Sequence, residues 1–225
     1  MLAVSLAGMI ALARPVAAQD EAGLLAKIDA MAQSRYQHVA GFSDTEHYVV
    51  YRGADQTNAA AEITVRVTYR KGVGKSYKVL SQSGSAIIQH FGLKPLLENE
   101  KEINDPAKVA ESWFTTANYE MHVSPAEQRM VGGRTCIGVA IHPKREAPNM
   151  IDGVLWVYAA DGSTCEVDGM ASKSPSMFAG TTHMMRDYAM MDGYAMATHA
   201  RAESSGMFGK TVVTIEYTDY KIEVK

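Results

Sequence analysis

The spacing of apolar positions changes from a helical period to a strand period early in the chain. Between Glu21 and Arg35 apolar residues recur every three or four positions, as on one face of a helix. These positions are Leu24, Leu25, Ile28, Met31 and Ala32. Over residues 62–71 apolar and polar side chains strictly alternate. This alternation predicts a half-buried antiparallel strand, because a parallel strand would be apolar on both faces.

Similar strand-like runs continue to the end of the chain, separated by turn signals such as Gly132–Gly133 and Asp192–Gly193. The runs are 42–52, 62–71, 76–81, 119–123, 127–131, 135–142, 153–158, 164–169, 181–190, 194–203 and 211–223. They predict an α+β protein, mainly antiparallel β, with about eleven strands in one sheet. A sheet of this length curls or closes.

Residues 84–118 interrupt the strands and supply the second helical segment. Asp105 followed by Pro106 is a typical helix start, and Val109 and Trp113 lie on the apolar side of the helix that it predicts. The apolar residues of 93–97 form either another short helix or a loop. The two helical segments are the only available cover for the apolar face of the sheet.

The first 18 residues differ from the rest and predict a cleaved signal peptide. Met1 to Leu12 is an apolar run, and Val16 and Ala18 place small side chains before a cleavage site at Gln19. We therefore expect a periplasmic protein whose mature part, 19–225, is a single domain with no membrane span. No linker or internal repeat divides it.

Composition and charge exclude several classes of protein. The chain has 225 residues, of which 47% are hydrophobic and 21% charged, as in an ordinary globular protein. A net charge of −3 gives no general attraction to nucleic acid. Its dispersed basic residues are interpreted as the solvated face of two strands; they are Arg66, Arg70, Lys71, Lys75 and Lys78.

The sequence contains no motif of a known catalytic, metal-binding or cofactor-binding site. The seven histidines are scattered, although His183 and His199 could approach each other across the hairpin at Asp192–Gly193. Asp44 and Glu46 share one face of a strand, and a solvated face is the default interpretation for such a pair. We expect neither an enzyme nor a cofactor.

Methionine is unusually frequent between residues 170 and 207. The eight methionines there are Met170, Met177, Met184, Met185, Met190, Met191, Met196 and Met207. Thioethers and the nearby histidines could bind Cu(I), but the spacing matches no repeated motif, so we expect no metal. Two other interpretations are core filling and a flexible apolar rim that suits an acyl chain.

The two cysteines, Cys136 and Cys165, fall on predicted strands that flank a third. Strands two apart in a flat sheet lie about 9–10 Å from each other, which is too far for a disulfide. The sequence therefore favours two separate thiols.

The meander region resembles the periplasmic outer-membrane lipoprotein carriers (LolA-like) and the related RseB-like sensor domains. The similar segments are 118–119, 133–136, 142–145, 153–157, 161–162 and 217–220. The resemblance implies a curved, half-open β-barrel with helices over its concave face. It also implies a cavity that holds lipid or lipoprotein acyl chains, and an inner-membrane exporter or regulator as a partner.

Together these patterns predict a non-enzymatic protein that binds a hydrophobic ligand, with possible transport to the outer membrane. The expected cavity-lining residues are Ile63, Val65, Val67, Tyr69, Ile137, Val139, Ile141, Val213, Ile215, Tyr217, Leu24, Ile28, Met31, Val109 and Trp113. The alternative is an envelope-stress sensor of the same fold. A copper-binding protein or an enzyme is a weaker hypothesis.

Overall fold

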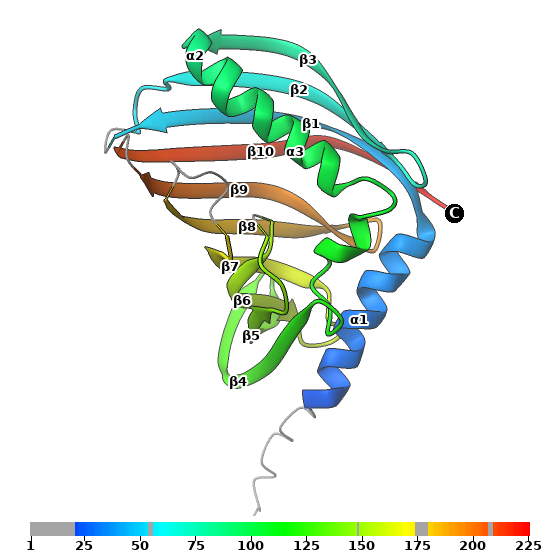
Figure 1. The fold of residues 1–225 in the computed structure, drawn as a ribbon. Coiled ribbons are helices and arrows are strands. Elements are labelled where there is room, and N and C mark those ends of the chain that lie inside the picture. Colours follow the sequence, from blue (N-terminus) through cyan, green and yellow to red (C-terminus); the bar gives the residue numbers. More distant parts are fainter. Residues whose placement is uncertain (1–20, 54–55, 148, 174–179, 207–208) are drawn as a thin grey trace, which may run out of the picture.

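The N-terminal helix predicted from the sequence is present. The computed structural model describes residues 21–225, apart from 54–55, 148, 174–179 and 207–208 (Figure 1). The first helix, α1, covers Glu21–His38 and buries Leu24 and Ile28, which lie one turn apart. The predicted signal peptide, 1–18, lies outside the described residues.

Ten strands form one antiparallel sheet in the order β3-β2-β1-β10-β9-β8-β7-β6-β5-β4, so β3 and β4 are its edges. The strands are β1 (Val39–Arg52), β2 (Ala61–Arg70), β3 (Gly74–Gly84), β4 (Tyr119–Val131), β5 (Arg134–Pro143), β6 (Ile151–Tyr158), β7 (Thr164–Ala171), β8 (Thr181–Met191), β9 (Tyr194–Gly206) and β10 (Gly209–Val224). The predicted α+β class with an open, curved sheet is confirmed.

The difference from the expected eleven strands arises in β4. The runs 119–123 and 127–131 are one strand, whose register against β5 shifts between Ser124 and Gln128. Proline has no backbone N–H to donate to a neighbouring strand, so Pro125 fits such an irregularity. The turn expected at Ser124–Pro125 is therefore a bulge within β4.

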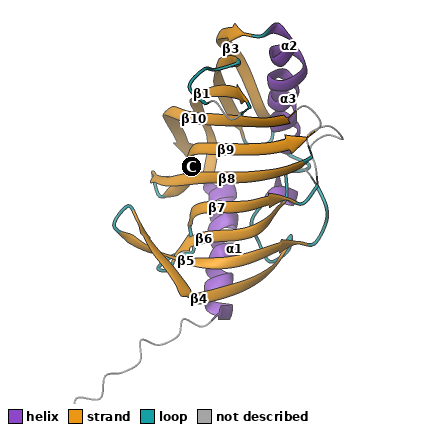
Figure 2. Ribbon diagram, turned by 90° about the vertical axis from the view of Figure 1, so that its left-hand side faces the viewer, coloured by secondary structure: helices purple, strands orange, loops and turns teal. Residues whose placement is uncertain are grey.

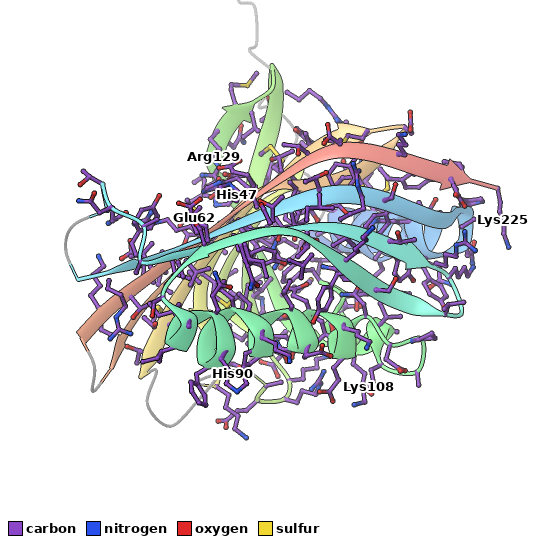
Figure 3. All side chains as sticks on the ribbon, turned by 90° about the horizontal axis from the view of Figure 1, so that it is seen from above. His47, Glu62, His90, Lys108, Arg129 and Lys225 are labelled. Carbon is purple, nitrogen blue, oxygen red and sulfur yellow. A yellow bond between two sulfur atoms is a disulfide. The ribbon has the colours of Figure 1, made fainter. Side chains whose placement is uncertain are left out.

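The sheet is strongly curved (Figures 2 and 3). Register shifts lie in β1 near Gly41 and Thr45, and bulges of this kind bend a strand. Gly153 of β6 faces Gly169 of β7, and a Cβ on Gly153 would lie 2.2 Å from the Asp168 carbonyl oxygen. The close approach of these two backbones requires glycine, and it contributes to the curvature.

Helical segments cover the concave face at two places. The residues α1 buries, Leu24 and Ile28, pack against a core formed by β4–β7. A continuous helical stretch, consisting of α2 (Ala86–Ile88), η1 (Gln89–Leu93, a π-helix) and α3 (Lys94–Ile103), covers a second core on β1, β2, β9 and β10. We call these residues, 86–103, the helical cover; Figure 1 shows α3 crossing the upper strands.

The prediction of an α-helix after Asp105–Pro106 is wrong. Asp105 does accept a hydrogen bond from the Ala107 backbone N–H, at 2.8 Å. The chain then forms only a short 3-10 helix, η2 (Val109–Ser112). The longer helix lies upstream, where Leu93 and Leu97, one turn apart, are buried against the sheet.

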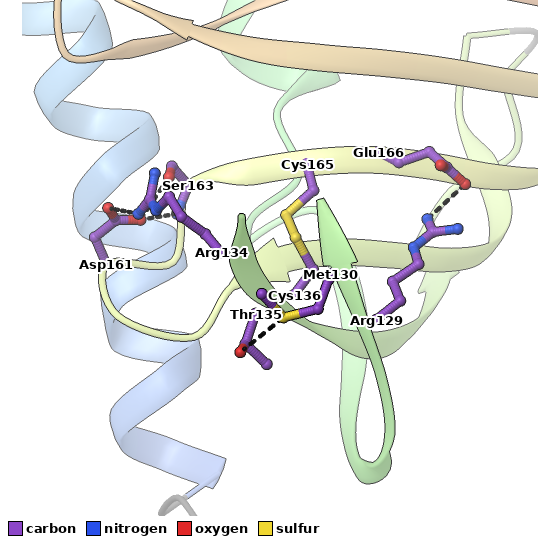
Figure 4. The surroundings of a disulfide bond; sticks show 9 residues. All are labelled: Arg129, Met130, Arg134, Thr135, Cys136, Asp161, Ser163, Cys165 and Glu166. Carbon is purple, nitrogen blue, oxygen red and sulfur yellow. Dashed lines mark hydrogen bonds and ion pairs between the residues drawn. A yellow bond between two sulfur atoms is a disulfide. The ribbon is translucent and has the colours of Figure 1, made fainter. Parts of the chain in front are cut away.

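The expectation of two separate thiols is also wrong, because Cys136 and Cys165 form a disulfide (Figure 4). Glu166 pairs with Trp156 and Thr164 with Val157, so Cys165 is the extra residue of a bulge in β7. This bulge and the curvature of the sheet bring the two Cα atoms to 6.7 Å, within the range that a disulfide spans. The prediction failed because it assumed a flat, regular sheet.

Removing this disulfide should lower stability without changing the fold. The cysteines are 29 residues apart in sequence, and closing a loop of that size restricts the unfolded chain. The double variant Cys136→Ser/Cys165→Ser should lose about 2–4 kcal/mol of unfolding free energy in urea titrations. The reduced wild type serves as the control and should match the variant. Alkylation of both cysteines in unreduced, native protein would contradict the assignment.

Candidate functional site

Nine predicted site residues line the concave face beneath the helices. Ile63, Val65, Val67, Ile215, Tyr217 and Val213 belong to the core under the helical cover, and Ile137, Val139 and Ile141 belong to the core under α1. Leu24 and Ile28 of α1 pack on the second of these groups. The structure therefore places the nine strand side chains on one face of one sheet, with six under the helical cover and three under α1.

Four further predicted residues lie elsewhere or at the margin. Tyr69 stacks on Phe42, with ring centroids 5.2 Å apart. Trp113 packs against Tyr36 of α1, with ring centroids 5.0 Å apart. Val109 lies in η2, and Met31 of α1 is half-buried. None of these four belongs to either described core.

A groove of about 520 Å³ opens between the helical cover and the edge of the sheet. Its apolar lining comes from Ile63 of β2, Tyr77 and Val79 of β3, and Leu97 of α3. The Gln89 side chain anchors this end of the cover by donating to the carbonyl oxygens of Glu62 and Ser83, at 2.6 and 2.7 Å. Two of these lining residues, Ile63 and Leu97, also belong to the apolar core beneath the cover.

Apolar side chains also lie exposed around this part of the molecule. Ile87 and Phe91 on the helical cover are 71% and 74% exposed, and Leu80 on β3 is 52% exposed. Phe91 lies within η1, and single π-helical turns inside longer helices are frequent at functional sites. Figure 3 shows His90, next to Phe91, on the side of the cover that faces away from the sheet.

A group of buried and partly buried charges joins the helical cover to the sheet. Lys75 Nζ of β3 lies 2.8 Å from Glu46 Oε1 of β1 and 3.3 Å from Glu100 Oε2 of α3. Arg186 Nη2 of β8 lies 3.6 Å from Glu100 Oε1. The Tyr48 hydroxyl donates a hydrogen bond to Glu46. We call Glu46, Lys75, Glu100 and Arg186 the ion cluster.

The position of the ion cluster shows how far the sheet wraps around α3. Four strands, β2, β1, β10 and β9, separate Lys75 on β3 from Arg186 on β8 in the sheet order. Both side chains nevertheless reach the same carboxylate, Glu100. The concave face therefore curves around this helix, and Glu100 lies between cations from β3 and β8.

The electrostatics of the ion cluster keep Lys75, Glu100 and Arg186 charged despite their removal from solvent. Burial alone would raise the pKa of Glu100, but the charges of Lys75 and Arg186 offset it and hold that pKa below its usual value. Burial lowers the pKa of Lys75, while Glu100 and Glu46 raise it to a net value above its usual range. Two cations and two anions balance, which such a buried arrangement requires.

Asp44 lies on the same face, two residues before Glu46, and is fully buried. Burial and the neighbouring charge of Glu46 raise its pKa from 3.8 to about 7. The Tyr220 hydroxyl is close enough to lower that pKa slightly, yet neither carboxylate oxygen receives a well-formed hydrogen bond from the described residues. Asp44 is therefore a buried acid that titrates near neutral pH.

The prediction that Asp44, Glu46 and Lys75 belong to solvated strand faces is wrong. Asp44 and Glu46 are 0% and 2% exposed, and the Lys75 side chain is 8% exposed. Sequence reasoning missed the ion cluster because its members are far apart in the chain. One signal was available: Glu100 follows Leu93 and Leu97 by seven and three residues, so it continues the apolar stripe of a helix.

The described histidines and methionines of residues 170–207 do not gather at one site. His183 pairs with Glu203 and His199 with Asp187 across the β8–β9 hairpin, so the two histidines lie four residues out of register. Each instead contacts a carboxylate at 2.6 Å: His183 that of Asp168, and His199 that of Glu216. Within the described part of the chain, no group of three His, Cys, Asp or Glu side chains could hold a metal ion.

The predicted methionine-rich rim is divided between environments. Met196 is buried, Met184 packs at the edge of the core under α1, and Met190 packs beside the disulfide. Met170 is 40% exposed. Met177 and Met207 lie outside the described residues. Core filling accounts for Met184, Met190 and Met196.

No helix among the described residues has the length and apolar character needed to cross a membrane. No protein-family model matches the chain, and no curated protein matches it.

Among solved structures, the chain is similar to a putative outer membrane lipoprotein-sorting protein domain from Vibrio parahaemolyticus. The TM-score is 0.51 at 11% identity, covering 88% of this chain and 91% of that one. A LolA superfamily protein from Nitrosomonas europaea has a TM-score of 0.45 at 9% identity, covering 89% and 92% of the two chains. A DUF1329 family protein from Desulfovibrio piger has a TM-score of 0.45 at 13% identity, covering 90% and 92%. The chain thus shares the fold of the lipoprotein-sorting protein domain, and the likeness extends to the fold alone.

The raised pKa of Asp44 predicts a specific pH dependence of stability. The folded state retains the Asp44 proton up to about pH 7, whereas the unfolded chain loses it near 3.8. The stabilisation from this group is complete below pH 3.8 and is lost as pH rises to about 7. The Asp44→Asn variant cannot ionise at this position. The difference in unfolding free energy between the variant and the wild type should therefore shift in favour of the variant by up to about 4 kcal/mol between pH 4 and pH 8.

Urea titrations of both proteins across this pH range measure the difference. Glu120→Gln is the control, because the Glu120 side chain on β4 is exposed. A constant difference between Asp44→Asn and wild type would contradict the assignment.

Proposed function

We propose that this protein is a non-enzymatic, periplasmic binding protein that holds a hydrophobic ligand between its concave face and the helical cover. The ligand would be a lipid, a lipoprotein acyl chain or another molecule with a long apolar part. Carriage of that ligand towards the outer membrane is the function we propose for the complex. The main support for this proposal is an apolar concave face that a separate helical stretch covers and that an open groove adjoins.

The contacts under the helical cover support this proposal. Leu93 and Leu97 are the buried apolar residues of the cover, and they pack on side chains of the β-strands. An acyl chain could replace these contacts with others of the same kind. Each buried methylene would contribute about 0.8 kcal/mol, so affinity needs little directional chemistry.

Release and uptake require the helical cover to move. Ser85 joins the cover to β3 on one side, and the residues after Ile103 lead from its other end towards β4. The π-helix η1 interrupts the regular hydrogen bonding of the helix and provides a place for that movement.

Export is supported by two features of the chain. Residues 1–18 have the pattern of a signal peptide, and the Cys136–Cys165 disulfide suits an oxidising compartment. The likeness to a lipoprotein-sorting protein domain is compatible with the same location. Residues 19–225 would then be the mature, single-domain protein.

The sensor hypothesis keeps one specific observation in its favour. β3 is an edge strand, and Val79 and Leu80 on it are 43% and 52% exposed. Such an edge can pair with a strand of a partner protein. A gene for a membrane-bound regulator beside this one would favour the sensor, and a gene for an exporter would favour the carrier.

The first experiment is native mass spectrometry of gently purified protein, with analysis of an organic extract alongside. The expected result is a bound amphiphile, or uptake of an added fluorescent fatty acid. A protein that is free of ligand and takes up no fatty acid would refute the proposed function.

A pair of variants tests where the ligand binds. Ile63 lines the groove and Thr64, the next residue, faces the opposite side of the sheet. Ile63→Trp should fill part of the groove and weaken fatty-acid binding at least about tenfold, because it takes the space of several methylenes. Thr64→Trp should leave binding unchanged. Equal binding by both variants would place the ligand elsewhere.

A further inference from the structure

Glu100 is the member of the ion cluster that the helical cover contributes. Glu46, Lys75 and Arg186 belong to strands β1, β3 and β8 and stay with the sheet when the cover moves. The carboxylate of Glu100 lies between Lys75 and Arg186, at 3.3 and 3.6 Å. It is attached to the apolar side of a helix that otherwise buries leucines.

Movement of the cover changes the charge on the concave face. With the cover in place, the ion cluster has two positive and two negative charges. Without Glu100, Lys75 and Arg186 keep Glu46 as the remaining carboxylate of the ion cluster, which leaves one unbalanced positive charge as long as the neighbouring Asp44 is protonated. A partly buried cation that loses its partner is strongly destabilising, so opening the cover would favour the arrival of another anion.

Arg186 is the cation that loses its acidic partner when the cover moves. Lys75 keeps its 2.8 Å contact with Glu46, which the Tyr48 hydroxyl also holds in position. Arg186 has Glu100 as its acidic partner within the ion cluster, together with the neighbouring phenols of Tyr188 and Tyr217. A guanidinium in this state presents a planar set of donors that matches a carboxylate or a phosphate.

We propose that the ligand is an amphiphile with an anionic head, and that this head replaces the Glu100 carboxylate between Lys75 and Arg186 when the helical cover moves. The inference rests on the proposed function and names the chemical class of its ligand. The carboxylate and phosphate heads share the required chemistry. With the cover in place, Glu100 occupies the position proposed for the head.

The surroundings fit the rest of such a molecule. The ion cluster adjoins the core under the cover, where Val65, Val67 and Leu97 are buried. A chain attached to the head would follow these side chains towards the groove at Ile63 and Val79. Tyr217 lies beside the cluster, and burial raises the pKa of its phenol, so it stays a neutral hydrogen-bond donor.

The test compares two probes that differ only in the charge of the head. Dansylaminoundecanoic acid and its methyl ester have the same chain and the same fluorophore. Their binding to the full protein is measured by fluorescence titration at pH 6, where Asp44, with a pKa of about 7, is mostly uncharged. The wild type should bind the acid at least about tenfold more tightly than the ester, as expected for charge-assisted hydrogen bonds.

Variants of the ion cluster should change this preference in opposite directions. Glu100→Gln removes the competing carboxylate, so it should tighten acid binding by about tenfold and leave ester binding little changed. Arg186→Gln should reduce the acid preference to about threefold or less, whereas Arg186→Lys should retain most of it. Glu98→Gln is the control, since Glu98 lies on the same helix and is half exposed.

Circular dichroism and urea titration establish that each variant folds. In Arg186→Gln the Glu100 carboxylate keeps Lys75, so this variant should fold.

The outcomes separate this inference from the proposed function. Equal binding of acid and ester by wild type and variants would overturn the anionic head and leave the proposed function intact. Equal tightening of both probes in Glu100→Gln would show that Glu100 only holds the cover down, which also overturns the inference. Failure of both probes to bind would refute the proposed function itself. Competition by dodecanoate and by monododecyl phosphate then distinguishes a carboxylate from a phosphate head.

Discussion

An apolar concave face on a sheet that does not close is the constraint on which the rest of this structure depends. The edges β3 and β4 lie at opposite ends of the ten-stranded sheet, so the strands alone cannot enclose the side chains between them. Two helical segments bury those side chains instead, α1 at one end and residues 86–103 at the other. A core built from a sheet and a separate cover can be opened without breaking strand pairing, which is the property that a carrier of apolar molecules needs.

The ion cluster makes the contact between cover and sheet directional, which hydrophobic packing alone does not. Apolar contacts have no direction and could be satisfied by any greasy molecule. Glu100, between Lys75 and Arg186, instead fixes the position of α3 and makes the charge balance of the concave face depend on it. Buried ion pairs add little net stability but are costly to break on one side only. The arrangement therefore favours an exchange of one anion for another over simple opening.

The sequence predicted what is periodic and failed where geometry departs from regularity. Alternation placed Ile63, Val65 and Val67 on one face, and the helical spacing of Leu24 and Ile28 predicted α1. The disulfide was missed because a bulge at Cys165 and the curvature of the sheet are not visible in a strand pattern. The burial of Lys75 and Asp44 was missed because it depends on contacts between segments far apart in the chain, and the helix at 94–103 was weaker in the sequence than the Asp105–Pro106 signal downstream of it.

Movement of the helical cover on ligand binding is the central claim, and a distance measurement tests it most directly. Spin labels at Lys101→Cys on α3 and Glu216→Cys on β10, both exposed positions, report the separation of cover and sheet by pulsed electron spin resonance. A second pair, Lys27→Cys on α1 with Glu216→Cys, serves as the reference. Saturating dodecanoate should lengthen the first distance and leave the second unchanged. An unchanged first distance in protein that has bound the ligand would contradict the account.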